Sequence, residues 1–84
     1  MIVIYGTTNC TYCKKAKDLA QQRGLQFEFR NMEVDNHHYE ELKALKPDFK
    51  KVPQIWWDDR YVGGYTNLAE EIENTLGGFG DGKI

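Results

Sequence analysis

The stretch TTNCTYCKKAK, Thr7–Lys17, joins an apolar segment to a segment of helical periodicity and holds both cysteines of the 84-residue chain. A disulfide between Cys10 and Cys13 would close a very short loop, which the chain-entropy model predicts to be weakly stabilising. A structural zinc site would need two further ligands. The two histidines, His37 and His38, are adjacent and would diverge by about 100° on a helix. The pair is therefore best interpreted as redox-active.

The composition argues against several classes of partner. The formal net charge is −2, and the lysine pairs at 14–15 and 50–51 form no basic stripe, so no nucleic-acid partner is expected. The first residues, MIVIYG, are too short an apolar run for a membrane span and lack the basic flank of a signal peptide. We expect a soluble, cytoplasmic protein without a membrane partner. In a reducing cytosol a close cysteine pair is more often catalytic or metal-binding than structural.

The first half of the chain predicts a β-α-β unit. Residues 2–5, IVIY, are apolar without alternation, which is typical of a strand covered on both faces. From residue 11 to 23 the apolar positions recur every three or four residues, which predicts a helix with Gly24 just after its end. Residues 25–30, LQFEFR, alternate and predict a second strand.

The middle of the chain predicts one helix and a hairpin. Asp35 or Asn36 can cap a second helix that Pro47 ends. Its predicted apolar stripe consists of Tyr39, Leu42 and Leu45. Residues 52–57, VPQIWW, predict a covered strand, and residues 61–62 predict a short returning strand. Such a hairpin indicates a mixed sheet, whose strand order periodicity alone leaves open.

A third helix is predicted to begin near Thr66 or Asn67, since Asn67 and Glu70 have the spacing of a capping box. Its predicted core positions are Leu68, Ile72 and Leu76. It should end at the glycines of positions 77–78. The element order is therefore β-α-β-α-β-β-α, which indicates an α/β domain.

The position of the cysteine pair indicates its chemistry. Cys10 falls between the first strand and the first turn of the following helix, where free N–H groups and the helix dipole favour an anion. Cysteines of Cys-X-X-Cys motifs at such positions have lowered pKa values. Lys14, one turn along the same face, should lower the pKa of Cys10 further. We therefore expect Cys10 to be the nucleophile and the more buried Cys13 to be the resolving thiol.

Three separated motifs carry a resemblance to a known family. CTYC resembles the Cys-Pro-Tyr-Cys active site of the dithiol glutaredoxins, KVPQI resembles their Thr-Val-Pro segment, and GGYTNL resembles their Gly-Gly-X-X-Asp segment. The resemblance implies a thioredoxin-like fold with strand order 2-1-3-4, strand 3 antiparallel to strand 1, and a cis peptide bond between Val52 and Pro53. It implies a glutaredoxin domain over residues 1–76 and a flexible glycine-rich tail over residues 77–84.

The same resemblance implies a glutathione-dependent thiol–disulfide oxidoreductase that serves electron transport and acts on protein disulfides and glutathionylated proteins as a monomer. Ribonucleotide reductase is among the partners that the family suggests. Glutathione is implied as co-substrate, and no metal is expected. The implied glutathione contacts are Tyr12, Lys51, Val52, Pro53, Gly64, Tyr65, Thr66 and Asn67.

Four positions depart from the family pattern. Thr11 replaces a proline, Thr7 replaces a frequent basic residue, Lys51 replaces a threonine, and Asn67 replaces the aspartate that meets the amino group of glutathione. Two alternatives stay open. One is a redoxin that thioredoxin reductase reduces. The other is a protein that shares a glutathione-ligated [2Fe–2S] cluster between two chains. Thr11 motivates this alternative, because it leaves the loop more flexible than proline would and keeps its backbone N–H.

Overall fold

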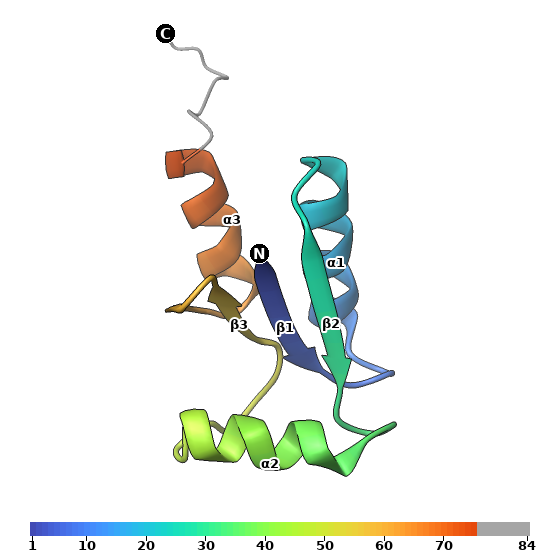
Figure 1. Cartoon of the computed structure of the whole chain (residues 1–84). Helices are drawn as coiled ribbons and strands as arrows, with labels where there is room; N and C mark the ends of the chain where they lie inside the picture. The colour runs from blue at the N-terminus through green and yellow to red at the C-terminus, as the bar shows by residue number, and fades with distance from the viewer. Residues whose placement is uncertain (76–84) are drawn as a thin grey trace, which may run out of the picture.

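The computed structural model describes residues 1–75 and contains four strands and three helices in the predicted order (Figure 1). The elements are β1 (Ile2–Gly6), α1 (Thr11–Gln22), β2 (Phe27–Asn31), α2 (Asn36–Leu45), β3 (Gln54–Trp57), β4 (Arg60–Gly63) and α3 (Tyr65–Thr75). Most boundaries lie within two residues of the sequence-based expectation. The predicted core position Leu76, the glycines that should end the last helix and the tail all lie outside the described residues.

The four strands form one mixed sheet in the order β2-β1-β3-β4. β1 runs parallel to β2 and antiparallel to β3, and β3 pairs with β4 as an antiparallel hairpin. Ile4 lies opposite Phe29 on one side and Ile55 on the other, so β1 is an interior strand. This explains its apolar sequence without alternation and confirms the strand order implied by the family resemblance.

The main core lies between the sheet and the pair of helices α1 and α3. Its buried members are Ile2, Ile4, Ala16, Ala20, Ile55, Leu68 and Ile72. The alternating residues of the second strand, among them Phe27 and Phe29, pack against this cluster. The helices lie side by side along the sheet (Figure 1), so the first turn of each is carried to the same end of the molecule.

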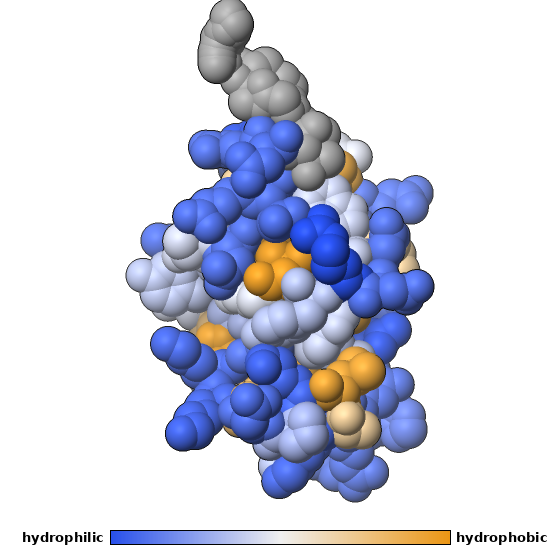
Figure 2. All heavy atoms as spheres, turned by 90° about the vertical axis from the view of Figure 1, so that its left-hand side faces the viewer, coloured by the Kyte–Doolittle hydropathy of each residue, from blue (hydrophilic) through white to orange (hydrophobic). Residues whose placement is uncertain are grey.

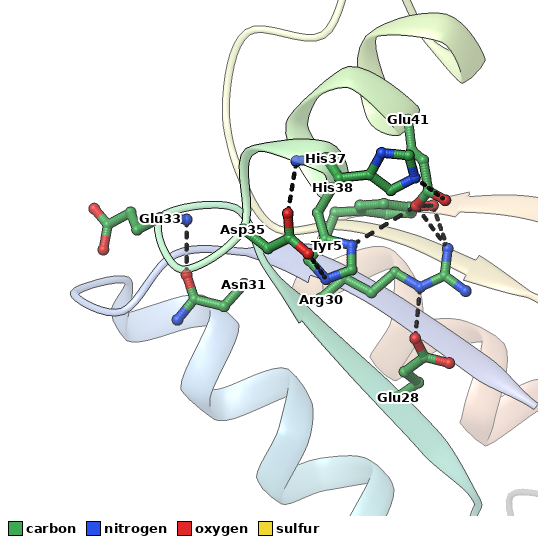
Figure 3. Close-up of polar contacts among 9 residues, drawn as sticks. All are labelled: Tyr5, Glu28, Arg30, Asn31, Glu33, Asp35, His37, His38 and Glu41. Atoms are coloured by element: carbon green, nitrogen blue, oxygen red, sulfur yellow. Dashed lines mark hydrogen bonds and ion pairs between the residues drawn. The ribbon is translucent and has the colours of Figure 1, made fainter.

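The opposite face of the sheet carries a polar and aromatic cluster (Figure 3). The ring of Tyr5 packs edge-on against Trp56 at 5.6 Å, and its hydroxyl accepts a hydrogen bond of 2.7 Å from Arg30. Arg30 also pairs with Glu28 at 2.7 Å and with Glu41 of α2 at 3.1 Å. Burial raises the pKa of Tyr5 above its ordinary value.

Helix α2 attaches to this face more narrowly than its sequence predicts. It runs across the strand direction near the end of β1 (Figure 1), and Asp35 caps it by accepting a 2.9 Å hydrogen bond from the His37 N–H (Figure 3). Leu42 is fully buried, but Tyr39 is 38% exposed and Leu45 is 58% exposed. Leu42 is therefore the one residue of the predicted apolar stripe that is buried, and the prediction is wrong for Tyr39 and Leu45.

Helix α3 begins at Tyr65, one to two residues before the expected start. Its first helical hydrogen bond joins the Leu68 N–H to the Gly64 carbonyl at 3.0 Å. Asn67 is thus the third residue of the helix and not its cap. Its Oδ1 accepts a 3.0 Å hydrogen bond from the Gly64 N–H, which is the role of the third residue in a capping box.

The surface seen from the left-hand side of Figure 1 is mostly hydrophilic, with small separate apolar patches (Figure 2). Exposed large apolar side chains in the described region are scattered along the chain: Met1, Tyr12, Val34, Tyr39, Leu45 and Tyr61. Between residues 1 and 75, no helix has both the length and the apolar character that a membrane crossing requires.

Candidate active site

Cys10 occupies the N-cap of α1. Its backbone is extended, with φ −106° and ψ 112°, and its carbonyl accepts the first helical hydrogen bond from the Lys14 N–H at 3.1 Å. Its Sγ accepts a hydrogen bond of 3.1 Å from the backbone N–H of Cys13. The sulfur therefore takes the place that an Asp or Ser side chain fills at an ordinary helix start.

The two cysteines form a disulfide, with their Cα atoms 5.2 Å apart. That separation lies in the usual range for the bond. Cys10 is half-buried, whereas Cys13 is 1% exposed. A substrate can therefore approach only Cys10, which supports the predicted order of attacking and resolving thiol. Gly6 adjoins the buried sulfur, since a Cβ there would lie 2.5 Å from the Cys13 Sγ.

The segment before β3 meets Cys10 from the other side. The carbonyl oxygen of Val52 lies 3.8 Å from the Cys10 Sγ. The peptide bond between Val52 and Pro53 is cis, which confirms the implication of the family resemblance. The sulfur of Cys10 thus lies between the first turn of α1 and the segment formed by residues 51–53.

A groove of about 370 Å³ begins at this segment. Its wall contains all eight residues that the resemblance implied as glutathione contacts, contributed by α1, the 51–53 segment and the start of α3. The rings of Tyr12 and Tyr65 stand 5.9 Å apart across it, inclined by 35°. Tyr12 is 55% exposed, so the groove has an open aromatic mouth beside the cysteine pair.

The groove is also lined by three residues that the sequence analysis did not select: Gln54, Tyr61 and Gly63. A weak signal for Gln54 exists, because it is a polar residue in a strand that is otherwise apolar. Tyr61 gives no such signal, since it enters the groove only through the pairing of β4 with β3. Gly63 has φ +123°, and a Cβ there would lie 2.6 Å from the Oδ1 of Asn67.

Lys14 lies apart from the groove. It lines a separate hollow of about 290 Å³ together with Cys10, Thr11 and the preceding loop. Lys14 thus borders the same hollow as Cys10, and its influence on the pKa of Cys10 stays a prediction. Within residues 1–75, no group of three or more His, Cys, Asp or Glu side chains is arranged to hold a metal ion.

Comparison with known proteins agrees with this geometry. The family model described as glutaredoxin matches residues 2–62. The chain belongs to the glutaredoxin family. Glutaredoxin 1 of Escherichia coli strain K12 is 36% identical over 81 residues, which cover 88% of this chain and 94% of the relative.

Two solved structures show the same fold at useful identity. Reduced Escherichia coli glutaredoxin gives a TM-score of 0.76 at 31% identity, covering 89% of this chain and 95% of the other. The NrdH-redoxin of Escherichia coli, a glutaredoxin-like protein with a thioredoxin-like activity profile, gives 0.69 at 27% identity, covering 89% and 92%.

Family membership and the Cys10–Cys13 pair together establish the class of reaction. The cysteines lie at disulfide distance in a family of thiol–disulfide oxidoreductases. Such a pair exchanges electrons with a substrate disulfide through a mixed-disulfide intermediate. The protein is therefore a thiol–disulfide oxidoreductase of the thioredoxin-like fold.

Proposed function

We propose that this protein is a glutathione-dependent oxidoreductase that reduces protein disulfides and glutathionyl mixed disulfides. One observation carries the proposal: the groove beside Cys10 gathers the eight residues that the sequence resemblance assigned to glutathione. They come from three segments that are distant in the sequence, namely Tyr12, residues 51–53 and residues 64–67.

In the first step the Cys10 thiolate attacks the glutathionyl sulfur of a protein–glutathione disulfide. A Cys10–glutathione disulfide forms, and the protein sulfur leaves as a thiolate that takes up a proton. The thiolate of a second glutathione then attacks the glutathionyl sulfur on Cys10. This releases oxidised glutathione and restores the Cys10 thiolate.

Protein disulfides use the second cysteine. Cys10 attacks one sulfur of the substrate and forms a mixed disulfide with it. The Cys13 thiolate then attacks the Cys10 sulfur, which closes the Cys10–Cys13 disulfide and frees the reduced substrate. Cys13 is held one helical turn away by the hydrogen bond from its N–H to the Cys10 Sγ, so this second step needs no chain rearrangement.

The groove offers the chemistry that a γ-glutamyl-cysteinyl-glycine needs. Val52 presents backbone groups beside Cys10, where the cysteinyl part would pair as an added strand does. The first turn of α3, residues 65–67, would offer N–H groups and a positive dipole end to the γ-glutamyl carboxylate. Lys51 supplies a positive charge for the second carboxylate of this anionic peptide.

A coupled assay tests the electron donor. We expect turnover of a glutathionylated peptide with glutathione and glutathione reductase, and little turnover with thioredoxin reductase alone. Cys10→Ser is the matched negative control, since it removes the attacking sulfur and retains the groove. Turnover with thioredoxin reductase and none with glutathione would overturn the proposal.

The second candidate is a redoxin fed by thioredoxin reductase, which the likeness to NrdH-redoxin favours. The same assay decides between the two donors. A shared [2Fe–2S] cluster stays a prediction that anaerobic reconstitution with glutathione tests through visible absorption and dimer formation. A cytoplasmic location, a monomeric state and ribonucleotide reductase as a partner also stay predictions.

A further inference from the structure

Gln54 is the one polar side chain that is buried within the described part of the chain, with 7% of its surface exposed. It lies directly after the cis Val52–Pro53 bond, at the first position of β3. Burying an amide is costly unless its donors and acceptor find partners. The partners that Gln54 finds connect the far strand of the sheet to the segment beside Cys10.

Two short hydrogen bonds fix the orientation of this amide. Its Nε2 donates to the backbone carbonyl of Lys51 at 2.7 Å, and its Oε1 accepts from the hydroxyl of Tyr61 at 2.6 Å. A carbonyl can only accept, so the amide nitrogen must face Lys51. The amide oxygen must then face Tyr61, whose hydroxyl has to donate. The two hydrogen bonds therefore run in one direction, from the Tyr61 hydroxyl through the Gln54 amide to the Lys51 carbonyl.

The ring of Tyr61 is held independently of its hydroxyl. It packs edge-on against Trp56 with centroids 4.9 Å apart, and the Nζ of Lys46 lies 4.8 Å above it. Removing the hydroxyl should therefore leave the ring in place. The effect of that change would be confined to the hydrogen bond to Gln54.

The carbonyl at the end of this chain belongs to the segment that forms the active site. Lys51 precedes Val52, whose carbonyl oxygen lies 3.8 Å from the Cys10 Sγ. Residues 51–53 and Tyr61 all line the groove. A displacement of this segment would move the backbone against which a peptide-like substrate pairs, and small misplacements of binding groups cost rate and affinity.

We propose that Tyr61, acting through Gln54, is a positioning residue that holds the 51–53 segment in its substrate-binding shape. The substrate it serves is the peptide part of a mixed disulfide at Cys10, so the proposal rests on the proposed function. Tyr61 contributes to the KM of the reaction and not to the chemistry at the sulfur.

The test uses Tyr61→Phe with a glutathionylated peptide, glutathione and glutathione reductase. Loss of one neutral hydrogen bond predicts a rise in the peptide's KM of about two- to ten-fold. The kcat at saturating peptide should stay within about two-fold of the wild type. The rate at which iodoacetamide alkylates reduced Cys10 should be unchanged, because the reagent needs no groove.

Tyr39→Phe is the matched control. Tyr39 is exposed to 38%, against 41% for Tyr61, packs edge-on against Phe49 at 6.0 Å, and has the Nζ of Lys43 at 5.8 Å. Its environment thus repeats that of Tyr61 outside the groove. Its KM should equal that of the wild type. Equal KM values for the two phenylalanine variants would overturn the proposal.

Gln54→Met supplies the coupling test, since it retains volume and removes both hydrogen bonds. Tyr61→Phe should raise KM in the wild type but not in the Gln54→Met background, because its hydroxyl then has nothing to transmit to Lys51. An equal rise in both backgrounds would mean that Tyr61 acts on the substrate directly. If Gln54→Met does not fold, the comparison of Tyr61→Phe with Tyr39→Phe still decides.

Failure of the proposed function gives a different result. If the wild-type protein shows no turnover with glutathione, glutathione dependence is refuted. The Tyr61–Gln54–Lys51 relay, meaning these two hydrogen bonds, can still be tested by comparing Tyr61→Phe with Tyr39→Phe. The KM is then measured for a peptide disulfide with thioredoxin reductase, since the Val52 backbone faces any peptide bound at Cys10. A KM that is equal for Tyr61→Phe and Tyr39→Phe there would overturn the relay as well.

Discussion

The backbone N–H of Cys13 donates a hydrogen bond of 3.1 Å to the Sγ of Cys10, so the Cys10 sulfur is itself the cap of α1. A thiolate at this place receives a hydrogen bond and lies at the positive end of the helix dipole. Both effects stabilise the charged form of the sulfur more than the thiol. We therefore expect the helix start to favour the thiolate of reduced Cys10 before any substrate binds.

We predict that the pKa of reduced Cys10 lies well below the free-thiol value of about 8.5. The measurement is the ultraviolet absorbance of the thiolate in Cys13→Ser, followed with pH. Lys14→Gln should raise the midpoint, and Lys17→Gln, further along the same helix, should not. A midpoint at the free-thiol value would contradict the role of the helix start.

The different exposure of the two sulfurs predicts separate losses on mutation. Cys10→Ser should abolish all disulfide reduction, because the accessible nucleophile is removed. Cys13→Ser should retain deglutathionylation and lose most reduction of protein disulfides, since Cys13 is 1% exposed and only resolves. Both substrates are assayed in parallel for each variant. Retained activity in Cys10→Ser would reverse the assignment.

The close packing at Gly6 predicts that a larger side chain there would displace Cys13. A Cβ there would lie 2.5 Å from the Cys13 Sγ and 2.9 Å from the Phe29 ring. Gly6→Ala should therefore destabilise the fold by about 1–3 kcal/mol, as overpacking does. Thermal unfolding of the reduced protein measures this, and the rate of Cys10–Cys13 disulfide formation should fall as Cys13 is displaced.

Gly24→Ala is the control for Gly6→Ala. Gly24 has φ +70° and no atom within 4 Å of its missing Cβ, so alanine there costs only backbone strain of about 1–2 kcal/mol. Its thiol chemistry should be that of the wild type. If both variants alter disulfide formation equally, the effect would come from lowered stability and not from contact with Cys13.

The polar cluster on the face of the sheet opposite the main core predicts a pH dependence of stability (Figure 3). The hydrogen bond from Arg30, helped by its charge, lowers the pKa of Glu28 below its ordinary 4.5. Because the folded-state pKa is depressed, the stabilisation is present above pH about 4.5 and is lost as the pH falls through the folded value. Glu28 is 43% exposed, so solvent limits the effect to about 1 kcal/mol at most.

Glu28→Gln should thus be slightly less stable than the wild type at pH 7, and the difference should vanish as the pH falls below the folded-state pKa of Glu28, where the carboxyl is protonated in both states. Urea unfolding at several pH values measures the difference. Glu73→Gln, an exposed position on α3, should lower stability less at pH 7. A difference for Glu28→Gln that stays constant with pH would exclude this ion pair as its source.

Some of the fold and site follows from local sequence, and some does not. Cys10 is found from sequence because a strand end, a Cys-X-X-Cys motif and a helix start coincide at one place. Tyr39 and Leu45 mislead, because periodicity marks an apolar face but not how much of it a neighbour covers. The sequence does not predict the hydrogen bond between Tyr61 and Gln54, because it depends on the pairing of two strands, which no local pattern encodes.

Asn67 lines the groove, and its Oδ1 already accepts a hydrogen bond from the Gly64 N–H at 3.0 Å. An aspartate there would keep that bond with one oxygen and offer a charged second oxygen to the ammonium of glutathione. Hydrogen bonds to charged groups are stronger than neutral ones by about 1 kcal/mol, which is on the order of five-fold in affinity. Asn67→Asp should therefore lower the KM for glutathione a few-fold.

The fold should tolerate this change, because a carboxylate in the first turn of α3 accepts the same backbone N–H and suits the helix dipole. The decrease in KM should become smaller as ionic strength rises, since the ammonium and the carboxylate are both near solvent. Asn36→Asp, at the start of α2 and outside the groove, adds the same charge and serves as the control. If Asn67→Asp leaves the KM unchanged at low salt, residue 67 does not face the amino group of glutathione, and the ligand would have to lie in the groove in another orientation.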